Sequence, residues 1–323
     1  MSYNKIMKLI NEYLEYLEIE KGRSRKTIDN YGRYLARFLK FSQVLEPAHI
    51  TDEIVRKYRL WLNRENLNRR TQNYHLIALR GFLKYLVRRG VQSLSPEVIE
   101  LAKTEERYID MVDADDLDRL LKAPAPDMPE RGSPQAKLER PALHNSLMCL
   151  RDKALLELLF STGLRVSELC SLDRDTVNPK KVEFSIRGKG GKIRVVFVSE
   201  DTRVALKEYL DKRGDVAPAL FVSAPRGSSV SAKMKEPSRL TPRTVQRIIK
   251  HYAIKAGISK KVTPHTLRHM FATDLLINGA DIRSVQQMLG HANVATTQVY
   301  THITDRQLRD VHTAFHGRQR KKK

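Results

Sequence analysis

The first 90 residues contain four successive segments in which apolar side chains recur at helical spacing. Apolar residues three and four positions apart lie on one face of a helix, and that face is buried against another helix. Glycines and capping residues such as Gly22, Ser24 and Thr51 separate the segments. The segments span about residues 4–20, 24–39, 51–62 and 70–89. Four helices with short connections predict a small helical bundle.

Beyond residue 100 the pattern changes to helices combined with one hairpin. Strand-like alternation covers residues 182–186 and 194–198, and the glycine-rich stretch 187–192 lies between them. Alternating segments joined by glycines predict a β-hairpin, here with a basic tip. Helical periodicity is found at residues 113–121, 146–172, 200–212, 241–256 and 263–312. The chain is therefore predicted to be mainly α-helical with a small β-sheet.

Changes in composition mark the expected domain boundaries. Residues 103–113 are charged and weakly periodic, which is typical of a linker, and residues 318–323 form a basic tail. We therefore expect a helical N-terminal domain at residues 1–102 and a second domain at 114–317. A segment at about 123–145 contains five prolines. Because proline lacks the backbone donor that helices and sheets need, we expect a surface loop or insertion there.

Net charge restricts the partners of the chain. Lys and Arg total 59 against 37 Asp and Glu, which gives a formal charge of +22. Such a charge favours nucleic acid, because Lys and Arg displace the counterions condensed on it. An anionic membrane surface or a ribosomal environment would be alternative partners. The sequence contains no apolar run of about 18 residues, so no membrane span is expected. Cys149 and Cys170 are isolated, which fits the reducing cytoplasm and excludes a C-x-x-C zinc or redox motif.

Two basic side chains lie beside glycines in the second domain. Arg165 follows Gly163 at the start of a predicted helix, where its planar fork could bind a phosphate. Lys189 lies between glycines at the hairpin tip, and glycines let a backbone approach DNA closely. Taken singly, most such arginines are surface salt-bridge partners, and such a lysine could belong to a solvated turn. The spacing around Lys189 also differs from that of a Walker nucleotide-binding loop.

Further polar residues follow toward the C-terminus. Pro264 begins a predicted helix in which His265 and Arg268 are three residues apart, so one turn places both on the same face. No nearby carboxylate or cysteine completes a metal site there. His291 follows a Leu-Gly pair, and Tyr300 lies nine residues further on. A lone tyrosine in a helical segment usually packs against a core.

The order of these residues changes their interpretation. Five features occur in this order between residues 162 and 300: an Arg, a Lys on a hairpin, His-x-x-Arg, Gly-His and a Tyr. This order resembles the tyrosine recombinase and phage integrase family, and the last three motifs are most similar to its Xer branch. The N-terminal helical pattern also resembles the core-binding domain of that family, so the resemblance covers nearly the whole chain. The proline-rich segment is longer than we expect for Xer proteins.

The resemblance implies both a fold and a reaction. The fold would be an N-terminal four-helix SAM-like core-binding bundle followed by a C-terminal α+β catalytic domain. The reaction would cut and rejoin DNA strands through a 3′-phosphotyrosyl intermediate, with no metal, nucleotide or other cofactor. The implied catalytic residues are Arg165, Lys189, His265, Arg268, His291 and Tyr300.

Tyr300 is the implied nucleophile, and Arg165 and Arg268 would bind the nonbridging phosphate oxygens. The resemblance makes Lys189 the general acid for the leaving 5′ oxygen.

The other polar residues have implied supporting roles. His265 would assist proton transfer to and from the tyrosine, and His291 would hydrogen-bond the phosphate. Glu168 matches an acidic position of the family and is expected to orient its neighbours.

The resemblance also implies partners. The two domains would clamp double-stranded DNA, and the enzyme would act as a homotetramer or as a heterotetramer with a paralogue. A terminal helix docks on the neighbouring protomer in this family, and residues 303–315 keep an amphipathic pattern. An FtsK-type septal translocase is a further expected partner, and the expected location is the cytoplasm, in association with the nucleoid. Candidate DNA contacts at the starts of helices two and four, which could equally face solvent, are Arg25, Lys26, Arg69 and Arg70.

Several functions stay open. The Xer-like motifs favour chromosome or plasmid dimer resolution, hence a role in chromosome partition and cell division, and mobile-element integration or excision is the alternative. A type IB topoisomerase shares similar chemistry, although the short chain argues against it. A non-catalytic DNA-binding protein needs the same charge and helices but not six residues at family spacing.

Overall fold

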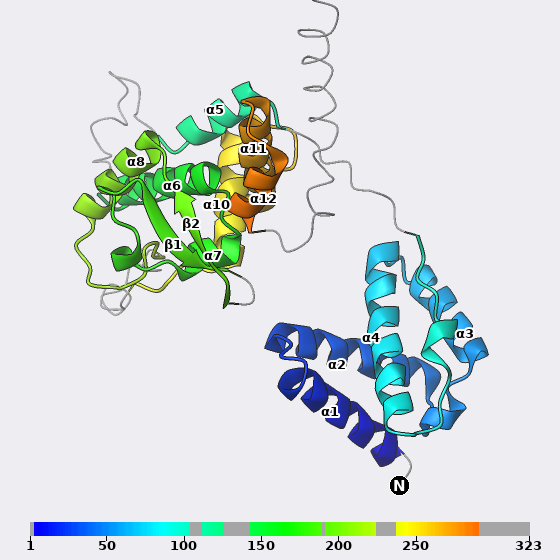
Figure 1. The fold of residues 1–323 in the computed structure, drawn as a ribbon. Helices are drawn as coiled ribbons and strands as arrows, with labels where there is room; N and C mark the ends of the chain where they lie inside the picture. The colour runs from blue at the N-terminus through cyan, green and yellow to red at the C-terminus, as the bar shows by residue number, and fades with distance from the viewer. Residues whose placement is uncertain (1–2, 104–111, 126–142, 189–190, 224–236, 291–323) are drawn as a thin grey trace, which may run out of the picture. The chain divides into compact units, whose positions relative to one another are not determined.

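The computed structural model describes residues 3–103, 112–125, 143–188, 191–223 and 237–290. The chain divides into two compact units, Met1–Tyr108 and Ile109–Lys323 (Figure 1). The division lies within the stretch 103–113 that the sequence indicates as a linker. Most of that stretch, most of the proline-rich segment and the basic tail lie outside the described residues.

The N-terminal unit contains the predicted helices, each close to its expected position. Capping side chains define where three of them begin: Ser24 accepts from the backbone N–H of Thr27, and Thr51 and Asn68 act in the same way. Two short 3-10 helices complete the described part of the unit. The elements are α1 (Tyr3–Ile19), α2 (Arg25–Ser42), η1 (Pro47–His49), α3 (Asp52–Arg64), α4 (Arg69–Arg88) and η2 (Pro96–Val98).

The apolar faces of these helices share one core that is rich in aromatic rings. Phe38 packs edge-on against Tyr58 with ring centroids 5.1 Å apart, and Trp61 stacks on Tyr58 at 5.8 Å. Helices α1 and α4 approach closely because Gly81 has no side chain where the Tyr13 hydroxyl lies. The core therefore fixes how the four helices lie against one another.

The C-terminal unit surrounds one central helix. Helix α6 (Leu143–Thr162) includes Leu155, Leu156, Leu158 and Leu159, none of which is exposed. Helices α8 and α11 pack on α6, which places it in the middle of the unit. The other elements are α5 (Ala114–Lys122), α7 (Val166–Ser171), η4 (Arg174–Thr176), α8 (Glu200–Lys212), α10 (Pro242–Lys255), α11 (Pro264–Ile277) and α12 (Ile282–Leu289).

The predicted hairpin is present as strands β1 (Glu183–Arg187) and β2 (Ile193–Phe197). The strands are antiparallel, with Glu183 opposite Phe197 and Arg187 opposite Ile193. The sequence pattern placed each strand within one residue of its observed position. The structure thus confirms a mainly α-helical chain with a small sheet.

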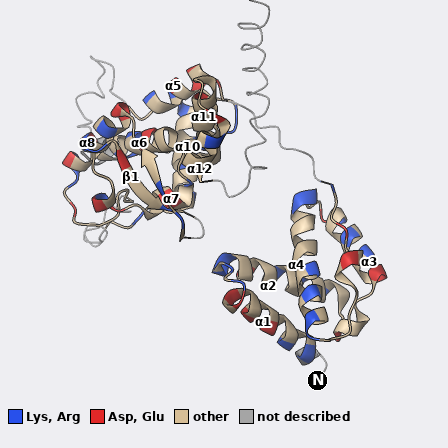
Figure 2. Cartoon of the chain, in the orientation of Figure 1, with Lys and Arg blue, Asp and Glu red and all other residues tan. Residues whose placement is uncertain are grey.

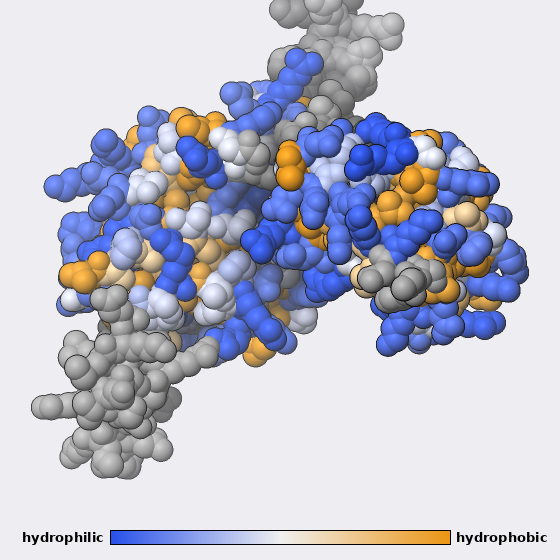
Figure 3. Space-filling model, turned by 90° about the horizontal axis from the view of Figure 1, so that it is seen from below, coloured by the Kyte–Doolittle hydropathy of each residue, from blue (hydrophilic) through white to orange (hydrophobic). Residues whose placement is uncertain are grey.

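The described residues on the face shown in Figure 3 are mostly hydrophilic, with scattered apolar patches. No helix in the described ranges is both long and apolar enough to cross a membrane.

Candidate active site

Arg165 lies at the turn between α6 and α7. Gly163 makes this turn with φ of +58°, and Arg165 is the residue that caps α7. Its Nη1 donates to Oε1 of Glu168 at 2.8 Å, and its Nη2 donates to the carbonyl of Gly290 at 3.1 Å. These bonds hold the guanidinium of Arg165 in place, and 31% of its side chain is exposed.

Arg268 lies one turn into α11. Pro264 occupies the first turn of this helix, and the hydroxyl of Thr263 accepts from the backbone N–H of Thr266 at 3.1 Å. Arg268 is buried, with 4% of the residue exposed. It donates through Nη1 to the carbonyl of Gly163 and through Nη2 to the carbonyl of Leu289.

The two arginines meet at the end of α12. Leu289 and Gly290 are consecutive, and Gly290 ends the helix with φ of +63°. The carbonyl of Leu289 binds Arg268 and the carbonyl of Gly290 binds Arg165. Three segments distant in sequence therefore place two guanidiniums side by side, an arrangement suited to one anion with several oxygens.

Glu168 is ionised at this site and shared by two arginines. Burial alone would raise the pKa of its carboxyl, but hydrogen bonds from Arg194 and from the backbone and side chain of Arg165 outweigh burial and lower the pKa to about 2. Arg194 was not identified from the sequence. The available signal was its position in β2, where period-two alternation places an arginine on the same face as the buried Val196.

His265 lies on α11 beside a second histidine. Its Nε2 is 3.0 Å from Nε2 of His269, a hydrogen bond in which one ring donates and the other accepts. His265 is exposed and His269 is partly buried. Within the described ranges no group of three or more His, Cys, Asp or Glu could hold a metal ion.

Lys189, His291 and Tyr300 lie outside the described residues, so their roles stay predictions. Their neighbours Gly188 and Gly290 are described, and both border Arg194. A Cβ atom added to either glycine would come within 3.1 Å of the Arg194 side chain. The residue directly before Lys189 and the residue directly before His291 therefore both lie beside the Arg194 side chain.

The candidate DNA-contacting residues of the N-terminal unit lie at the starts of α2 and α4. Arg25, Lys26 and Arg69 are exposed, and Arg70 is partly buried. Helix α4 contains no acidic residue, and Figure 2 shows several Lys and Arg positions in blue along its ribbon.

Helix α10, which the sequence analysis did not single out, has the same character. It contains no acidic residue and exposes Arg243, Arg247 and Lys250. The absence of Asp and Glu over residues 242–255 is the signal that could have identified this helix.

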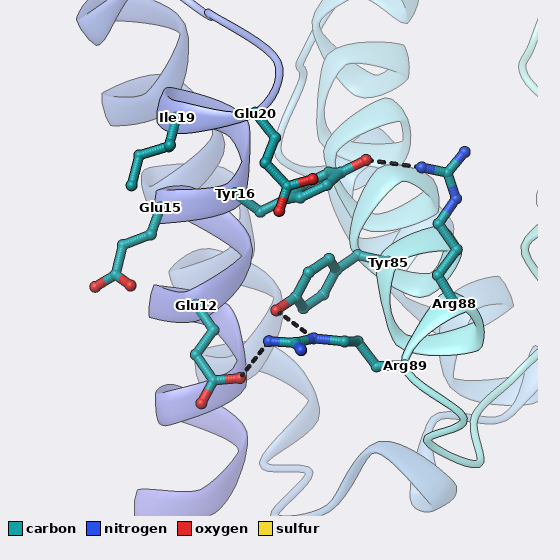
Figure 4. Close-up of a pocket in the computed structure, with 8 residues that line it drawn as sticks. All are labelled: Glu12, Glu15, Tyr16, Ile19, Glu20, Tyr85, Arg88 and Arg89. Carbon is teal, nitrogen blue, oxygen red and sulfur yellow. Dashed lines mark hydrogen bonds and ion pairs between the residues drawn. The ribbon is translucent and has the colours of Figure 1, made fainter.

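A separate hollow of about 410 Å³ lies between α1 and α4 (Figure 4). Its polar groups bind one another: Arg88 donates to the Tyr16 hydroxyl at 2.7 Å, and Arg89 donates to the Tyr85 hydroxyl at 3.1 Å. Arg89 also pairs with Glu12 at 3.8 Å. The bonds of Arg88 with Tyr16 and of Arg89 with Glu12 join the two helices, so we assign the hollow a structural role.

Both parts of the chain match known protein families. Residues 139–307 match the phage integrase family, and residues 10–90 match the phage integrase N-terminal SAM-like domain. The chain is 34% identical to tyrosine recombinase XerD of Oceanobacillus iheyensis, over 96% of this chain and 98% of that protein. It is 33% identical to tyrosine recombinase XerC of Thermodesulfovibrio yellowstonii, over 95% of each chain.

Solved structures agree with this relationship. The crystal structure of XerA recombinase is 31% identical and matches with a TM-score of 0.50, over 96% of this chain and 99% of that one. A lambda integrase dimer bound to a COC′ core site shares the fold, with a TM-score of 0.66 at 17% identity over 91% of this chain and 94% of that one. The chain is therefore a member of the phage integrase family, the tyrosine recombinases.

Proposed function

We propose that this protein is a site-specific recombinase that cuts double-stranded DNA, retains one strand end as a phosphotyrosine and rejoins it to a new strand. The observation that supports this most directly is the pair of guanidiniums of Arg165 and Arg268, bound to the consecutive carbonyls of Gly290 and Leu289. Their planar donor forks match the nonbridging oxygens of a phosphodiester.

In the proposed reaction the hydroxyl oxygen of Tyr300 attacks phosphorus. The bond from phosphorus to the 5′ oxygen breaks as the bond to tyrosine forms, which leaves a 3′-phosphotyrosyl link and a free 5′ hydroxyl. Attack adds negative charge to the nonbridging oxygens, and hydrogen bonds from Arg165 and Arg268 stabilise that charge. Because the covalent link conserves the bond energy, the 5′ hydroxyl of another strand can reverse the step.

Three side chains would move protons or support the phosphate. Lys189 donates a proton to the leaving 5′ oxygen, and His265 accepts the proton of the Tyr300 hydroxyl. His291 donates a hydrogen bond to the phosphate as its charge increases. The contacts of Gly188 and Gly290 with Arg194 support the first and last of these assignments, because each glycine directly precedes one of these residues.

Helices α4 and α10, which contain no acidic residue, would bind the DNA backbone. Arg69 and Arg70 on α4 belong to one surface, together with Arg25 and Lys26 on α2. The exposed basic residues of α10 form a second surface, on the C-terminal unit, which also contains Arg165 and Arg268. Contacts of this kind position the duplex and make binding depend on salt.

Within recombination, we favour an Xer-type role in resolving chromosome or plasmid dimers over mobile-element integration. Relatives named XerD and XerC are about one-third identical over nearly the full chain, whereas the lambda and Tn1549 integrases share 17% identity and support the fold alone. In this role the protein would act in the cytoplasm on the nucleoid, as a tetramer with itself or with a paralogue, and with an FtsK-type septal translocase as activator.

The test is covalent capture on DNA. A nicked duplex that loses a short fragment after cleavage traps the enzyme on the strand end. Wild-type protein should form an adduct, and Tyr300→Phe should bind the same duplex without forming one. An adduct with Tyr300→Phe would contradict the assignment, no adduct with the wild type would favour a non-catalytic DNA-binding protein, and sequence-independent relaxation of supercoiled plasmid would favour a type IB topoisomerase.

A further inference from the structure

Arg194 is a charged residue on the inward face of a strand. It is the second residue of β2, and side-chain alternation places it on the face of the buried Val196. Only 11% of its side chain is exposed, whereas Ile193 and Val195 beside it are 68% and 45% exposed. A charge in such a position needs a compensating partner.

Glu168 is that partner, and it is shared. Arg194 donates from Nη1 to Oε1 at 3.0 Å and from Nη2 to Oε2 at 2.7 Å, which is a bidentate pair. The same two oxygens accept from Arg165: Oε1 from its Nη1 at 2.8 Å, and Oε2 from its backbone N–H at 2.9 Å. One carboxylate therefore connects Arg194 to the arginine at the candidate phosphate site.

The charges show why this connection matters. Two guanidiniums and one carboxylate leave the cluster with a single positive charge. Without Arg194, the charges of Arg165 and Glu168 would cancel, and the buried carboxylate would lose two of the four hydrogen bonds described above. Glu168 would then be free to draw Arg165 toward itself and to repel a phosphate.

Arg194 also touches backbone on both sides of the site. Its side chain lies against Gly188, at the end of β1, and against Gly290, after α12. These are the residues before Lys189 and His291. The position of Arg194 is thus coupled to the hairpin and to the turn that binds Arg165 through the Gly290 carbonyl.

We propose that Arg194 is a positioning residue for strand cleavage: it fixes Glu168, and through Glu168 it holds the fork of Arg165 in the geometry that binds the scissile phosphate. The proposal rests on the phosphate-binding role proposed above for Arg165. Arg194 itself need not touch DNA.

The experiment compares two nicked duplexes that contain the cleavage site mapped from wild-type adducts. One has the ordinary phosphodiester at the cleavage position, and the other has a methylphosphonate, in which a methyl group replaces one charged oxygen. Single-turnover cleavage and DNA affinity are measured for full-length wild type, Arg165→Gln and Arg194→Gln. Arg203→Gln, which removes an arginine paired with Glu200 on α8, is the control for loss of charge.

On the phosphodiester, Arg194→Gln should cleave about 100-fold more slowly at unchanged DNA affinity, because small misplacement of a phosphate-binding group has an effect of that size. On the uncharged methylphosphonate the slowing should be smaller, as for Arg165→Gln, because less charge needs to be stabilised. Arg203→Gln should match the wild type. Arg194→Lys, which keeps the charge but not the bidentate fork, should cleave at an intermediate rate.

Wild-type cleavage by Arg194→Gln would overturn the proposal, and so would equal slowing on both duplexes, which would indicate a purely structural role. If Arg194→Gln does not fold, as judged by its thermal unfolding, Arg194→Lys decides the question by the same comparison of the two duplexes. Absence of any wild-type adduct would instead overturn the proposed recombinase function. A third result is that Arg165→Gln is slowed less on the methylphosphonate than on the phosphodiester while Arg194→Gln cleaves both duplexes like the wild type. That result would overturn only the role of Arg194.

Discussion

The backbone carbonyl of Gly163 accepts a hydrogen bond from the guanidinium of Arg268. Gly163 has φ of +58°, and a Cβ atom there would lie 2.5 Å from Cδ1 of Phe271 and 3.0 Å from Cδ2 of Leu289. Phe271 is one turn beyond Arg268 on α11. The turn that presents Arg165 is therefore the same turn that anchors Arg268, and it has no room for a side chain.

We expect Gly163→Ala to destabilise the C-terminal unit and to slow cleavage strongly. The left-handed backbone conformation costs a residue with a Cβ about 1–2 kcal/mol, and the overlap with Phe271 adds about 1–3 kcal/mol. Gly257→Ala is the matched control, since Gly257 has φ of +69° but nothing within 4 Å of the added atom. Urea unfolding followed by far-ultraviolet circular dichroism, with the cleavage rate, measures both effects. Equal destabilisation by the two variants would contradict the steric part of this account.

In the N-terminal unit, Gly81→Ala should destabilise the packing of α1 on α4. Alanine is favoured over glycine inside a helix by about 1 kcal/mol, but here its methyl group would meet the Tyr13 hydroxyl. Tyr13 cannot move aside easily, because its ring packs against Phe82 and Tyr85 at 5.7 and 5.5 Å. We expect a net loss of about 1–3 kcal/mol.

Tyr13→Phe in the same protein should reverse this loss, since the nearest remaining ring atom, Cζ, is 3.5 Å from the added methyl group. Trp61 is the single tryptophan of the chain and lies in this unit. Its fluorescence during urea unfolding therefore reports this unit alone. A double variant no more stable than Gly81→Ala would show that the hydroxyl is not the obstacle.

The stability of the N-terminal unit should fall with pH in the range in which His75 titrates. Burial, with a contribution from Arg37, lowers the pKa of His75 to about 4 from an ordinary value of 6.5. Its Nδ1 is 2.9 Å from the Tyr58 hydroxyl, and the two groups share a hydrogen bond. Between pH 6.5 and 4 the unfolded chain binds a proton that the folded unit excludes, so stability is complete above pH 6.5 and is lost as pH falls.

The expected loss is about 3 kcal/mol, at 1.4 kcal/mol for each pKa unit. Trp61 fluorescence during urea unfolding at several pH values measures it. His75→Gln removes the titrating group, so its stability should vary less over this range. An unchanged pH dependence in His75→Gln would show that another group is responsible.

DNA binding should respond to α4 and not to α3. Arg69→Ala should weaken binding and reduce the slope of log affinity against log salt by about 1, as expected for one lost phosphate contact. Arg56→Ala on α3 is the control, because Arg56 is paired with Glu53 at 2.9 Å and is similarly on the surface. Fluorescence anisotropy of a labelled duplex at several salt concentrations measures the slope. Equal slopes for both variants and the wild type would remove Arg69 from the proposed interface.

Truncation at about Asp305 should leave DNA binding intact and prevent assembly into a tetramer. The removed residues include most of the amphipathic pattern of Ile303 to Phe315, which the family resemblance implies is a docking helix. Native gel shifts with one and two DNA duplexes distinguish binding from assembly. Recombination by the truncated protein at the wild-type rate would refute this role.

The sequence predicted much of the fold because its determinants are local. Helix starts follow from capping residues such as Ser24, Thr51 and Thr241, each of which accepts the expected backbone hydrogen bond. The hairpin was found from alternation, which locates strands but leaves their ends uncertain by a residue. The isolated bridges of Asp173 with Ala219 and of Val222 with Arg239 were not predicted, because they depend on how distant segments pack.

For the site, the sequence identified residue types in order but not the groups that hold them. It indicated Arg165, Arg268 and Glu168, and the structure brings all three into one cluster with Arg194. Arg194 was treated as part of a strand pattern, since a charge that points inward is recognised only once its partner is known. Lys189, His291 and Tyr300 stay predictions.

Two groups that bind the terminal nitrogens of Arg268 are main-chain oxygens, those of Gly163 and Leu289. Truncating neighbouring side chains one at a time leaves both oxygens in place, so alanine scanning in its usual form would not report these two hydrogen bonds. The sensitive positions are those where atoms are added: a single methyl group at Gly163, or at Gly290 beside Arg194, meets a neighbour within 3.1 Å. Mapping these main-chain contacts therefore requires variants that enlarge residues, beside those that remove side-chain groups.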